Sequence, residues 1–160
     1  MRRVLVDINV VLDVLLARRP GADGSAAFWS EAEGGGIVAL LPAHAFTTVH
    51  YLVGREKGKA VADGVVKDLL SVFRVAPVSA AVLEDAASRG WADFEDAVTA
   101  CSGIASRCEA IVTRDVSGFR KSPLPVVTPE EASALIHAGG GRMKGRSRPG
   151  NRRRSGSPAS

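Results

Sequence analysis

The sequence predicts a single α/β domain in which helices cover a parallel central sheet. Its 160 residues suit one domain. Hydrophobic residues make up 46% and charged residues 24%, which excludes wholesale disorder and fibrous architectures. Short apolar runs of strand length alternate with longer segments of helical spacing. This alternation favours parallel strands that are joined by helical crossovers.

The first half of the chain begins with a short buried strand at residues 3–6. Residues 9–17 follow with helical spacing, and the Arg-Arg-Pro-Gly run at 18–21 stops the helix. Ser25 is predicted to cap a helix that runs to residue 33 and ends at three glycines. The remaining elements of this half are a strand at 37–41, helices at 44–55 and 59–72, and a strand at 73–76.

In the second half, Ser79 is predicted to cap a helix that runs to residue 88. A final helix begins at residues 128–131, where Thr-Pro-Glu-Glu combines a capping box with a proline at the first helical position. Glycines 139–141 end this helix. The elements between these two helices are a helix at 94–107 and strands at 110–113 and 125–127.

Charge divides the chain into two parts. Residues 139–160 carry seven of the 21 lysines and arginines and no acid, which leaves 14 cations against 17 acids in residues 1–138. We therefore expect a mildly acidic domain at 1–138 and a disordered basic tail at 139–160. Two interpretations of the tail stay open: RNA binding through its cations, or a solvated and dispensable segment. The cations most expected to contact RNA are the consecutive Arg152, Arg153 and Arg154.

The location predicted for the protein is the cytoplasm, away from membranes. No apolar run approaches the roughly 18 residues that a membrane span needs. The apolar segment that follows the first residues is too short for a secretory signal, and an acid interrupts it at position 7. Two cysteines do not make a disulfide framework, so a reducing compartment is expected.

Acidic residues follow two of the predicted strands and open one helix. Asp7 follows the first strand, and Asp115 follows the strand at 110–113. Asp93 and Asp96 are three residues apart at a helix start and share a face, whereas Glu95 should point elsewhere. The carboxyl ends of parallel strands lie at one edge of a sheet, so these acids can meet there. An all-oxygen set favours Mg²⁺ or Mn²⁺, which activates water and orients a phosphodiester.

Each acid also has a purely structural interpretation. The helix dipole favours Asp93 and Asp96 at a helix start whatever their function, and an aspartate after a strand is often a turn or cap residue. His44 and His50 are six residues apart and do not share a face as ligands would, so packing or surface roles are expected. Trp91 is expected in the core or an interface, because no interleaving of basic and aromatic residues supports base stacking.

The sequence around the acids resembles the PIN-domain nucleases, in particular the VapC-like toxins of bacterial toxin–antitoxin pairs. The similarity covers residues 3–137, and its motifs stand in the family's order and spacing. The segments that carry it are VLVDINVVLD at 4–13, DFEDA at 93–97, IVTRD at 111–115, SGF at 117–119 and VVTPEE at 126–131.

The resemblance implies a PIN-like three-layer α/β/α sandwich with a parallel central sheet. It also implies a Mg²⁺- or Mn²⁺-dependent endoribonuclease that a small antitoxin protein inhibits, in a family whose toxins are commonly homodimers. Matched motif to motif, Asp7, Asp96 and Asp115 would be catalytic metal-binding carboxylates, and Asp93 is a candidate fourth ligand.

The same match gives neighbouring polar residues possible roles in orienting ligands or substrate. Asn9 would orient by hydrogen bonds or else serve as a helix cap, and Thr113 would orient or else be an ordinary strand-end hydroxyl. Arg114 would contact phosphate or else pair with an acid.

The chain departs from the family pattern in the helix after the second strand. Many PIN nucleases carry a second acid there, whereas residues 43–52 contain none, and Thr48 or a near neighbour takes its place. A hydroxyl binds a cation far less well than a carboxylate does. Gly118 likewise stands where relatives often have an acid. These departures leave metal affinity open.

Two other functions stay open, the first because of the missing acid and the second because of the residues after the first strand. One is a degenerate PIN fold that binds RNA or protein without catalysis. The other is a phosphatase of the haloacid dehalogenase type, since Asp7 and Asn9 resemble that family's opening pair of acids, although the second acid is here an amide.

Overall fold

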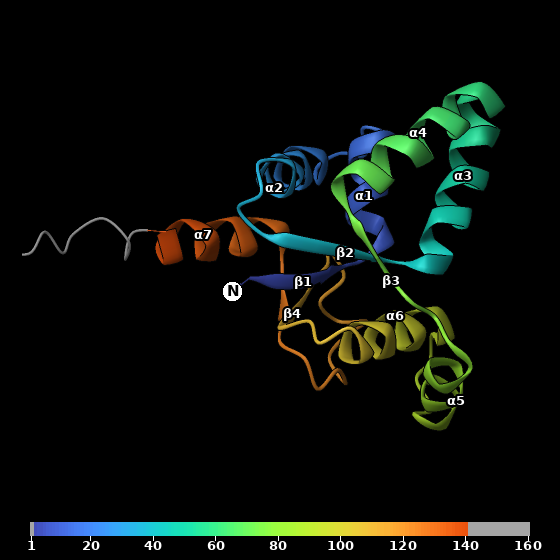
Figure 1. The fold of residues 1–160 in the computed structure, drawn as a ribbon, viewed down its shortest axis with the longest axis vertical. Helices are drawn as coiled ribbons and strands as arrows, with labels where there is room; N and C mark the ends of the chain where they lie inside the picture. Colours follow the sequence, from blue (N-terminus) through green and yellow to red (C-terminus); the bar gives the residue numbers. More distant parts are fainter. Residues whose placement is uncertain (1, 141–160) are drawn as a thin grey trace, which may run out of the picture.

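A parallel sheet forms the centre of the structure, a computed structural model that describes residues 2–140 (Figure 1). Within that range the chain forms five strands and seven helices. In chain order they are β1 (Arg3–Val6), α1 (Ile8–Leu15), α2 (Ala22–Glu33), β2 (Val38–Pro42), α3 (Ala43–Lys57), α4 (Lys59–Val72), β3 (Arg74–Ala76), α5 (Ala80–Ser88), α6 (Phe94–Ala105), β4 (Ala110–Val112), β5 (Val126–Val127) and α7 (Pro129–Gly140).

The strand order is β3-β2-β1-β4-β5, and every neighbouring pair is parallel. The chain therefore builds outward from β1 to β2 and β3, then crosses back to add β4 and β5 on the other side. The direction of winding reverses between β1 and β4, where Val6 pairs with Val112. In open α/β sheets, ligands bind at such a reversal, beyond the carboxyl ends of the strands.

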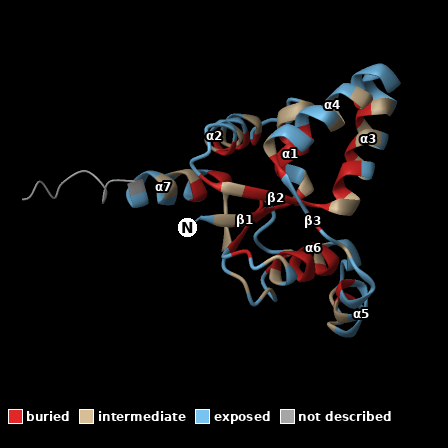
Figure 2. Cartoon of the chain, viewed as in Figure 1, coloured by how far each residue is buried: buried red, intermediate tan, exposed pale blue. Residues whose placement is uncertain are grey.

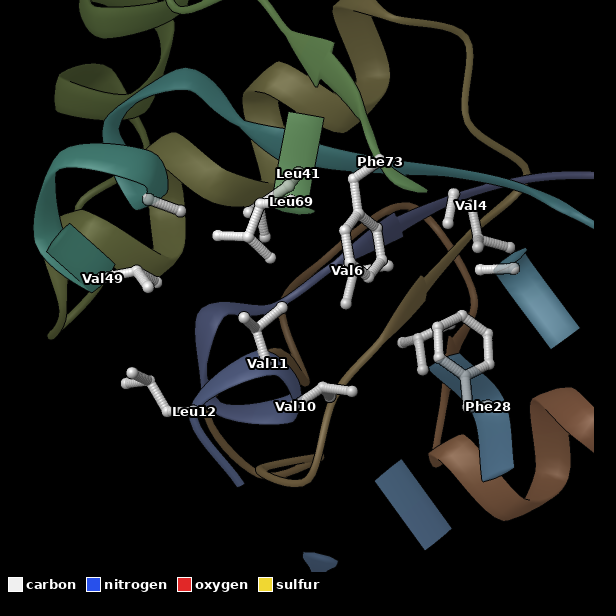
Figure 3. Close-up of a cluster of buried hydrophobic side chains, with 14 of the residues drawn as sticks. Val4, Val6, Val10, Val11, Leu12, Phe28, Leu41, Val49, Leu69 and Phe73 are labelled. Carbon is white, nitrogen blue, oxygen red and sulfur yellow. The ribbon is translucent and has the colours of Figure 1, made fainter. Parts of the chain in front are cut away.

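Each face of the sheet packs against its own hydrophobic core, because successive residues of a strand point to opposite sides. Val4 and Val6 of β1 belong to the larger core, together with Phe28 and Phe73 (Figure 3). Leu5 points to the other face, where it packs with residues of β2, β4 and α6. Buried residues follow the sheet and the inward sides of the helices (Figure 2).

Helices cover both faces of the sheet. The larger core takes side chains from α1, α2, α3, α4 and α7, whereas α5 and α6 lie on the opposite face (Figure 1). The predicted three-layer α/β/α sandwich with a parallel central sheet is therefore confirmed. None of the described helices is both long and apolar enough to span a membrane.

Two predicted caps are present. The Ser79 hydroxyl accepts the Val82 N–H at 3.3 Å at the start of α5. At the start of α7, the Thr128 N–H donates to Glu131 at 2.8 Å, and the Glu131 N–H donates to the Thr128 hydroxyl at 3.2 Å. This reciprocal pair is the capping box that the sequence predicts.

The predicted role of Ser25 is wrong. Helix α2 begins at Ala22, so Ser25 lies inside it, fully buried, and its hydroxyl donates to Asp13 at 3.4 Å. Helix α7 continues to Gly140, so the predicted domain boundary at 138 falls in its last turn. Residues 141–160 lie outside the described range, and with them Arg152, Arg153 and Arg154 of the predicted tail.

Candidate active site

Asp7 stands where β1 ends and α1 begins, and its side chain is only 2% exposed. Its N–H donates to the Val112 carbonyl at 2.9 Å, so the pairing of β1 with β4 fixes its position. Burial raises the pKa of Asp7, and hydrogen bonds from Thr113 and Asn9 oppose that rise. No lysine, arginine or histidine of residues 2–140 forms an ion pair with it.

Thr113 connects Asp7 to the segment that follows β4. The Thr113 side chain is fully buried, and its hydroxyl donates to the Asp7 carboxylate at 2.9 Å. The same oxygen accepts the Asp115 N–H at 3.0 Å. One hydroxyl is therefore hydrogen bonded both to the Asp7 carboxylate and to the backbone of Asp115. Asn9 adds a weaker contact from its side-chain amide to Asp7, at 3.3 Å.

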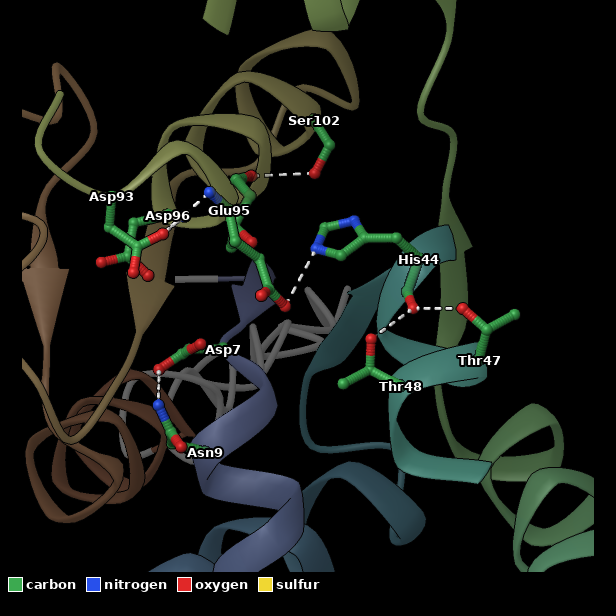
Figure 4. Close-up of polar contacts among 10 residues, drawn as sticks. Asp7, Asn9, His44, Thr47, Thr48, Asp93, Glu95, Asp96 and Ser102 are labelled. Carbon is green, nitrogen blue, oxygen red and sulfur yellow. Dashed lines mark hydrogen bonds and ion pairs between the residues drawn. The ribbon is translucent and has the colours of Figure 1, made fainter. Parts of the chain in front are cut away.

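Asp93 and Asp96 lie at the start of α6, across the site from α1 (Figure 4). Asp93 is the N-cap of this helix, and one of its carboxylate oxygens accepts the N–H groups of Glu95 at 2.8 Å and Asp96 at 3.2 Å. Asp96 is half-buried. Burial raises its pKa to about 6, and the negative charges of Asp93, Asp7 and Asp115 add to the rise. These carboxylates are therefore close enough to repel one another.

The carboxylates of Asp115 and Asp96 both lie next to Gly118. A Cβ on Gly118 would lie 2.8 Å from an Asp115 carboxylate oxygen and 2.9 Å from one of Asp96. The absence of a side chain there is what allows both carboxylates to occupy this space. The Ser117 hydroxyl donates to Asp115 at 2.7 Å and the Gly118 N–H at 3.0 Å, and these hydrogen bonds lower the pKa of Asp115.

A cavity of about 270 Å³ opens between α1, α3 and α6 at this edge of the sheet. Asp7, Asn9 and Thr48 line it, facing Asp93 and Asp96. Thr48 occupies the α3 side, where its hydroxyl donates to the His44 carbonyl at 3.2 Å. The threonine predicted to replace the family's second acid therefore does border the site, with its hydroxyl hydrogen bonded to its own helix.

Glu95 also lines this cavity, although its place one residue before Asp96 on the helix predicts that it points elsewhere. One of its carboxylate oxygens lies 3.6 Å from His44 Nε2, on α3 (Figure 4). Burial lowers the pKa of His44 and Glu95 opposes this, while His44 Nδ1 is buried with no hydrogen-bond partner in the described residues. Because Asp93 caps the helix, Glu95 falls in the first turn, beside α3, a position that helical spacing alone does not reveal.

Arg114 turns away from the carboxylates toward α1 and α7. Its guanidinium lies 3.6 Å from Asp13 and 3.9 Å from Glu130. Of the two interpretations left open by the sequence, the structure shows the pairing with acids. Both contacts are long, and the guanidinium still borders a second hollow of about 260 Å³ that also reaches Asn9 and Asp115.

The donors at this edge suit a hard divalent cation in their chemistry. They are carboxylates that repel one another, with neutral hydroxyls beside them, and such cations bind oxygen ligands. No three acidic, histidine or cysteine side chains among residues 2–140 already converge as a metal site. Asp7, Asp93 and Asp96 instead line one cavity, and Asp115 lies next to it, on the other side of Asp96.

Comparisons with known proteins agree with this fold. A family model that describes the PIN domain matches residues 3–117. Among solved structures, FitAcB from Neisseria gonorrhoeae aligns with a TM-score of 0.63 at 19% identity, over 79% of this chain and 97% of that one. A comparison with curated protein sequences finds no match.

Two further solved structures have the same fold. VapBC2 from Rickettsia felis, bound to a fragment of its promoter DNA, aligns with a TM-score of 0.60 at 15% identity, over 79% of this chain and 98% of that one. VapC20 from Mycobacterium tuberculosis, a toxin that cleaves the sarcin–ricin loop, aligns with a TM-score of 0.60 at 17% identity, over 74% and 94%.

Replacing Asp96 by asparagine should stabilise the protein in EDTA. The folded-state pKa of Asp96, about 6, exceeds its ordinary value of 3.8. The folded protein therefore loses free energy of unfolding as the pH rises from 3.8 through 6 and Asp96 becomes charged. At a pH above 6, Asp96→Asn should raise the melting temperature by a few degrees, on the order of a 1 kcal/mol gain once the full shift is discounted for solvent screening of this half-exposed group. The gain should shrink as the pH falls toward 3.8.

Thermal unfolding across this pH range tests the prediction, with Asp68→Asn as a matched control on the exposed face of α4. A gain that did not change with pH, or a lower melting temperature for Asp96→Asn, would contradict it.

Removing the Thr113 hydroxyl should destabilise the fold. Thr113→Val keeps the shape of the side chain but removes the shorter of two side-chain donors to the buried Asp7 carboxylate, and with it the acceptor of the Asp115 N–H. Urea unfolding should show a loss of about 1–3 kcal/mol, the usual penalty for an unsatisfied buried group. Thr113→Ser keeps the hydroxyl and should lose clearly less. Equal losses for the two variants would mean that packing, and not the hydrogen bond, stabilises this position.

Proposed function

This chain belongs to the PIN domain family, and from that premise we propose that it is a Mg²⁺- or Mn²⁺-dependent endoribonuclease, the toxin of a toxin–antitoxin pair. The observation that carries the proposal is the gathering of acids from three distant segments at the reversal point of the sheet. Asp7 and Asp96 line one cavity, and Asp96 and Asp115 share the space beside Gly118. We take Asp7, Asp96 and Asp115 as the ligands, with Asp93 as a fourth through its second oxygen.

The surrounding residues of the chain would hold these ligands in place. Thr113 and Asn9 orient Asp7, and the Ser117 hydroxyl and the Gly118 N–H orient Asp115. Donors of this kind fix ligand direction and strengthen metal sites. A divalent cation bound there would supply activation of water and neutralisation of charge on the scissile phosphate. Thr48 borders the cavity as a neutral group and leaves room for substrate.

The partners follow from the same premise. RNA is the substrate, and a small antitoxin protein is the inhibitor, a role supported by the fold that this chain has in common with VapBC2 and FitAcB. A homodimer, a cytoplasmic location and RNA contacts by the tail at 139–160 complete the proposal.

A degenerate PIN fold that binds without catalysis is the second candidate. It is favoured by one observation: α3 contributes Thr48 and Leu52 to the cavity, where many PIN nucleases carry an acid. Calorimetry with Mn²⁺ separates the two, since a nuclease should bind the ion below millimolar concentration. The phosphatase hypothesis gains no such support, because Asn9 contacts Asp7 as an amide donor and the family match is to the PIN domain.

Substitution of the ligands should abolish cleavage while the fold persists. Asp7→Asn and Asp96→Asn each remove one charged oxygen donor from the site. Losing a group behind a ligand typically costs about 10–100-fold in affinity or activity, so losing a ligand should cost more. The measurement is cleavage of total RNA with Mg²⁺ or Mn²⁺, and with EDTA, alongside circular dichroism of each variant.

Asp68→Asn, a change on the exposed face of α4, should cleave like the unaltered protein. Undiminished cleavage by both Asp7→Asn and Asp96→Asn, or cleavage that survives EDTA, would refute the assignment.

Gly118→Ala should weaken metal binding without unfolding the protein. The added methyl group would meet the Asp115 and Asp96 carboxylate oxygens at less than 3 Å, and these flexible side-chain ends must move away. Isothermal titration should show at least about tenfold weaker Mn²⁺ binding, as expected when ligands lose their orientation. The melting temperature should stay the same or rise slightly, because alanine restricts the unfolded chain.

The matched control is Gly64→Ala, since a Cβ at Gly64 in α4 has no neighbour within 4 Å. Unchanged Mn²⁺ affinity in Gly118→Ala would show that the two carboxylates do not act on one ion.

A further inference from the structure

A hollow of about 390 Å³ lies beside the candidate active site, on the side away from α1 and α3. Its walls come from the segment that leads into α6 and from the segment after β4. Asp96 and Asp115 form the side that it shares with the active site, and Gly118 keeps the passage open. Cavities of about 300–1,000 Å³ hold small-molecule-sized groups, so this hollow suits a single nucleotide.

Two cations stand at the far side of this hollow. Arg120 and Lys121 both line it and both are exposed. Neither forms an ion pair with an acid of residues 2–140, whereas Arg114, Arg89 and Arg19 all do. Unpaired cations beside a group of repelling carboxylates offset the charge that would otherwise turn a phosphate chain away.

Trp91 supplies an aromatic surface in the same hollow. It is half-buried, and its ring packs edge-on against Phe119, with centroids 6.2 Å apart. This contact holds the indole in place while part of it remains accessible. The sequence showed no interleaving of aromatic and basic residues, but the fold places Trp91 with Arg120 and Lys121. An aromatic face near two cations is the arrangement that binds unpaired bases and their phosphates.

We propose that this hollow is a nucleotide subsite, which binds the residue next to the scissile phosphate in an unpaired stretch of RNA. Arg120 and Lys121 contact the flanking phosphate, and Trp91 contacts the base. A base inside a duplex would have to unpair and unstack to enter the hollow, so we expect a substrate that is single-stranded at the cut. The inference rests on the proposed function, because it places the nucleotide relative to a cleavage site.

The test measures binding of full-length protein to a fluorescently labelled RNA oligonucleotide by anisotropy, in EDTA so that no cleavage occurs. Single-stranded RNA should bind more tightly than a duplex of the same sequence. In the double variant Arg120→Ala with Lys121→Ala, the slope of log K against log salt should fall by about 0.7, since each phosphate of a single strand that is neutralised contributes about 0.7. The matched control, Lys67→Ala with Arg74→Ala, removes two exposed cations outside the hollow and should keep the slope.

Trp91 is tested by two substitutions that differ in aromatic character. Trp91→Leu should reduce the preference for single-stranded RNA at least about fivefold, while Trp91→Phe should retain most of it; the loss corresponds to about 1 kcal/mol of stacking. Circular dichroism identifies a variant that has not folded, and in that case the Arg120 and Lys121 variant decides the outcome.

Two results would overturn the inference: a salt slope that the Arg120 and Lys121 substitutions leave unchanged, or equal affinity for single-stranded and duplex RNA. Cleavage of the same RNA after addition of Mn²⁺ is scored separately. A protein that cleaves but shows either result retains the proposed function without this subsite. A protein that shows the predicted binding but never cleaves retains the subsite without the proposed function.

Discussion

The parallel pairing of β1 with β4 is the constraint from which the candidate site follows. It joins segments more than a hundred residues apart and sets Val6 beside Val112, so the next residue of each strand emerges at the same edge. Asp7 and Thr113 meet there through a hydrogen bond of 2.9 Å. A register shift by one residue would point these side chains to opposite faces of the sheet. The alternation of buried residues into two cores is therefore also what aligns the site.

The fold was predictable because its signals are local. Strand-length apolar runs, the Ser79 cap and the capping box at Thr128 and Glu131 act within a few residues. The prediction for Ser25 was wrong because a serine before an apolar run gives the same sequence pattern in two situations. It can cap a helix, or it can lie inside one and donate a hydrogen bond to another helix, as Ser25 does to Asp13. That distinction depends on how α1 and α2 pack, which local pattern does not contain.

The predicted carboxylates were found by their positions at strand and helix ends, but their neighbours were not. Glu95 borders the cavity because α6 begins opposite α3, where His44 lies 3.6 Å from it. Arg114 pairs with Asp13 and Glu130, which come from helices at opposite ends of the chain. Trp91 lines the same hollow as Arg120 and Lys121 only because the segment after β4 lies beside the segment that leads into α6. All three are consequences of helix placement over the sheet, which residue spacing does not encode.

The packing of α2 against α7 affects which charges surround Arg114. A side chain at Gly21 would collide with the Arg114 guanidinium, and one at Gly24 would collide with the Glu130 carboxylate. Because Gly21 and Gly24 have no side chains, Glu130 of α7 can lie close to Arg114, the residue before Asp115. Trimming the chain before α7 would release that arginine from one of its two acids and make the rim of the site more cationic.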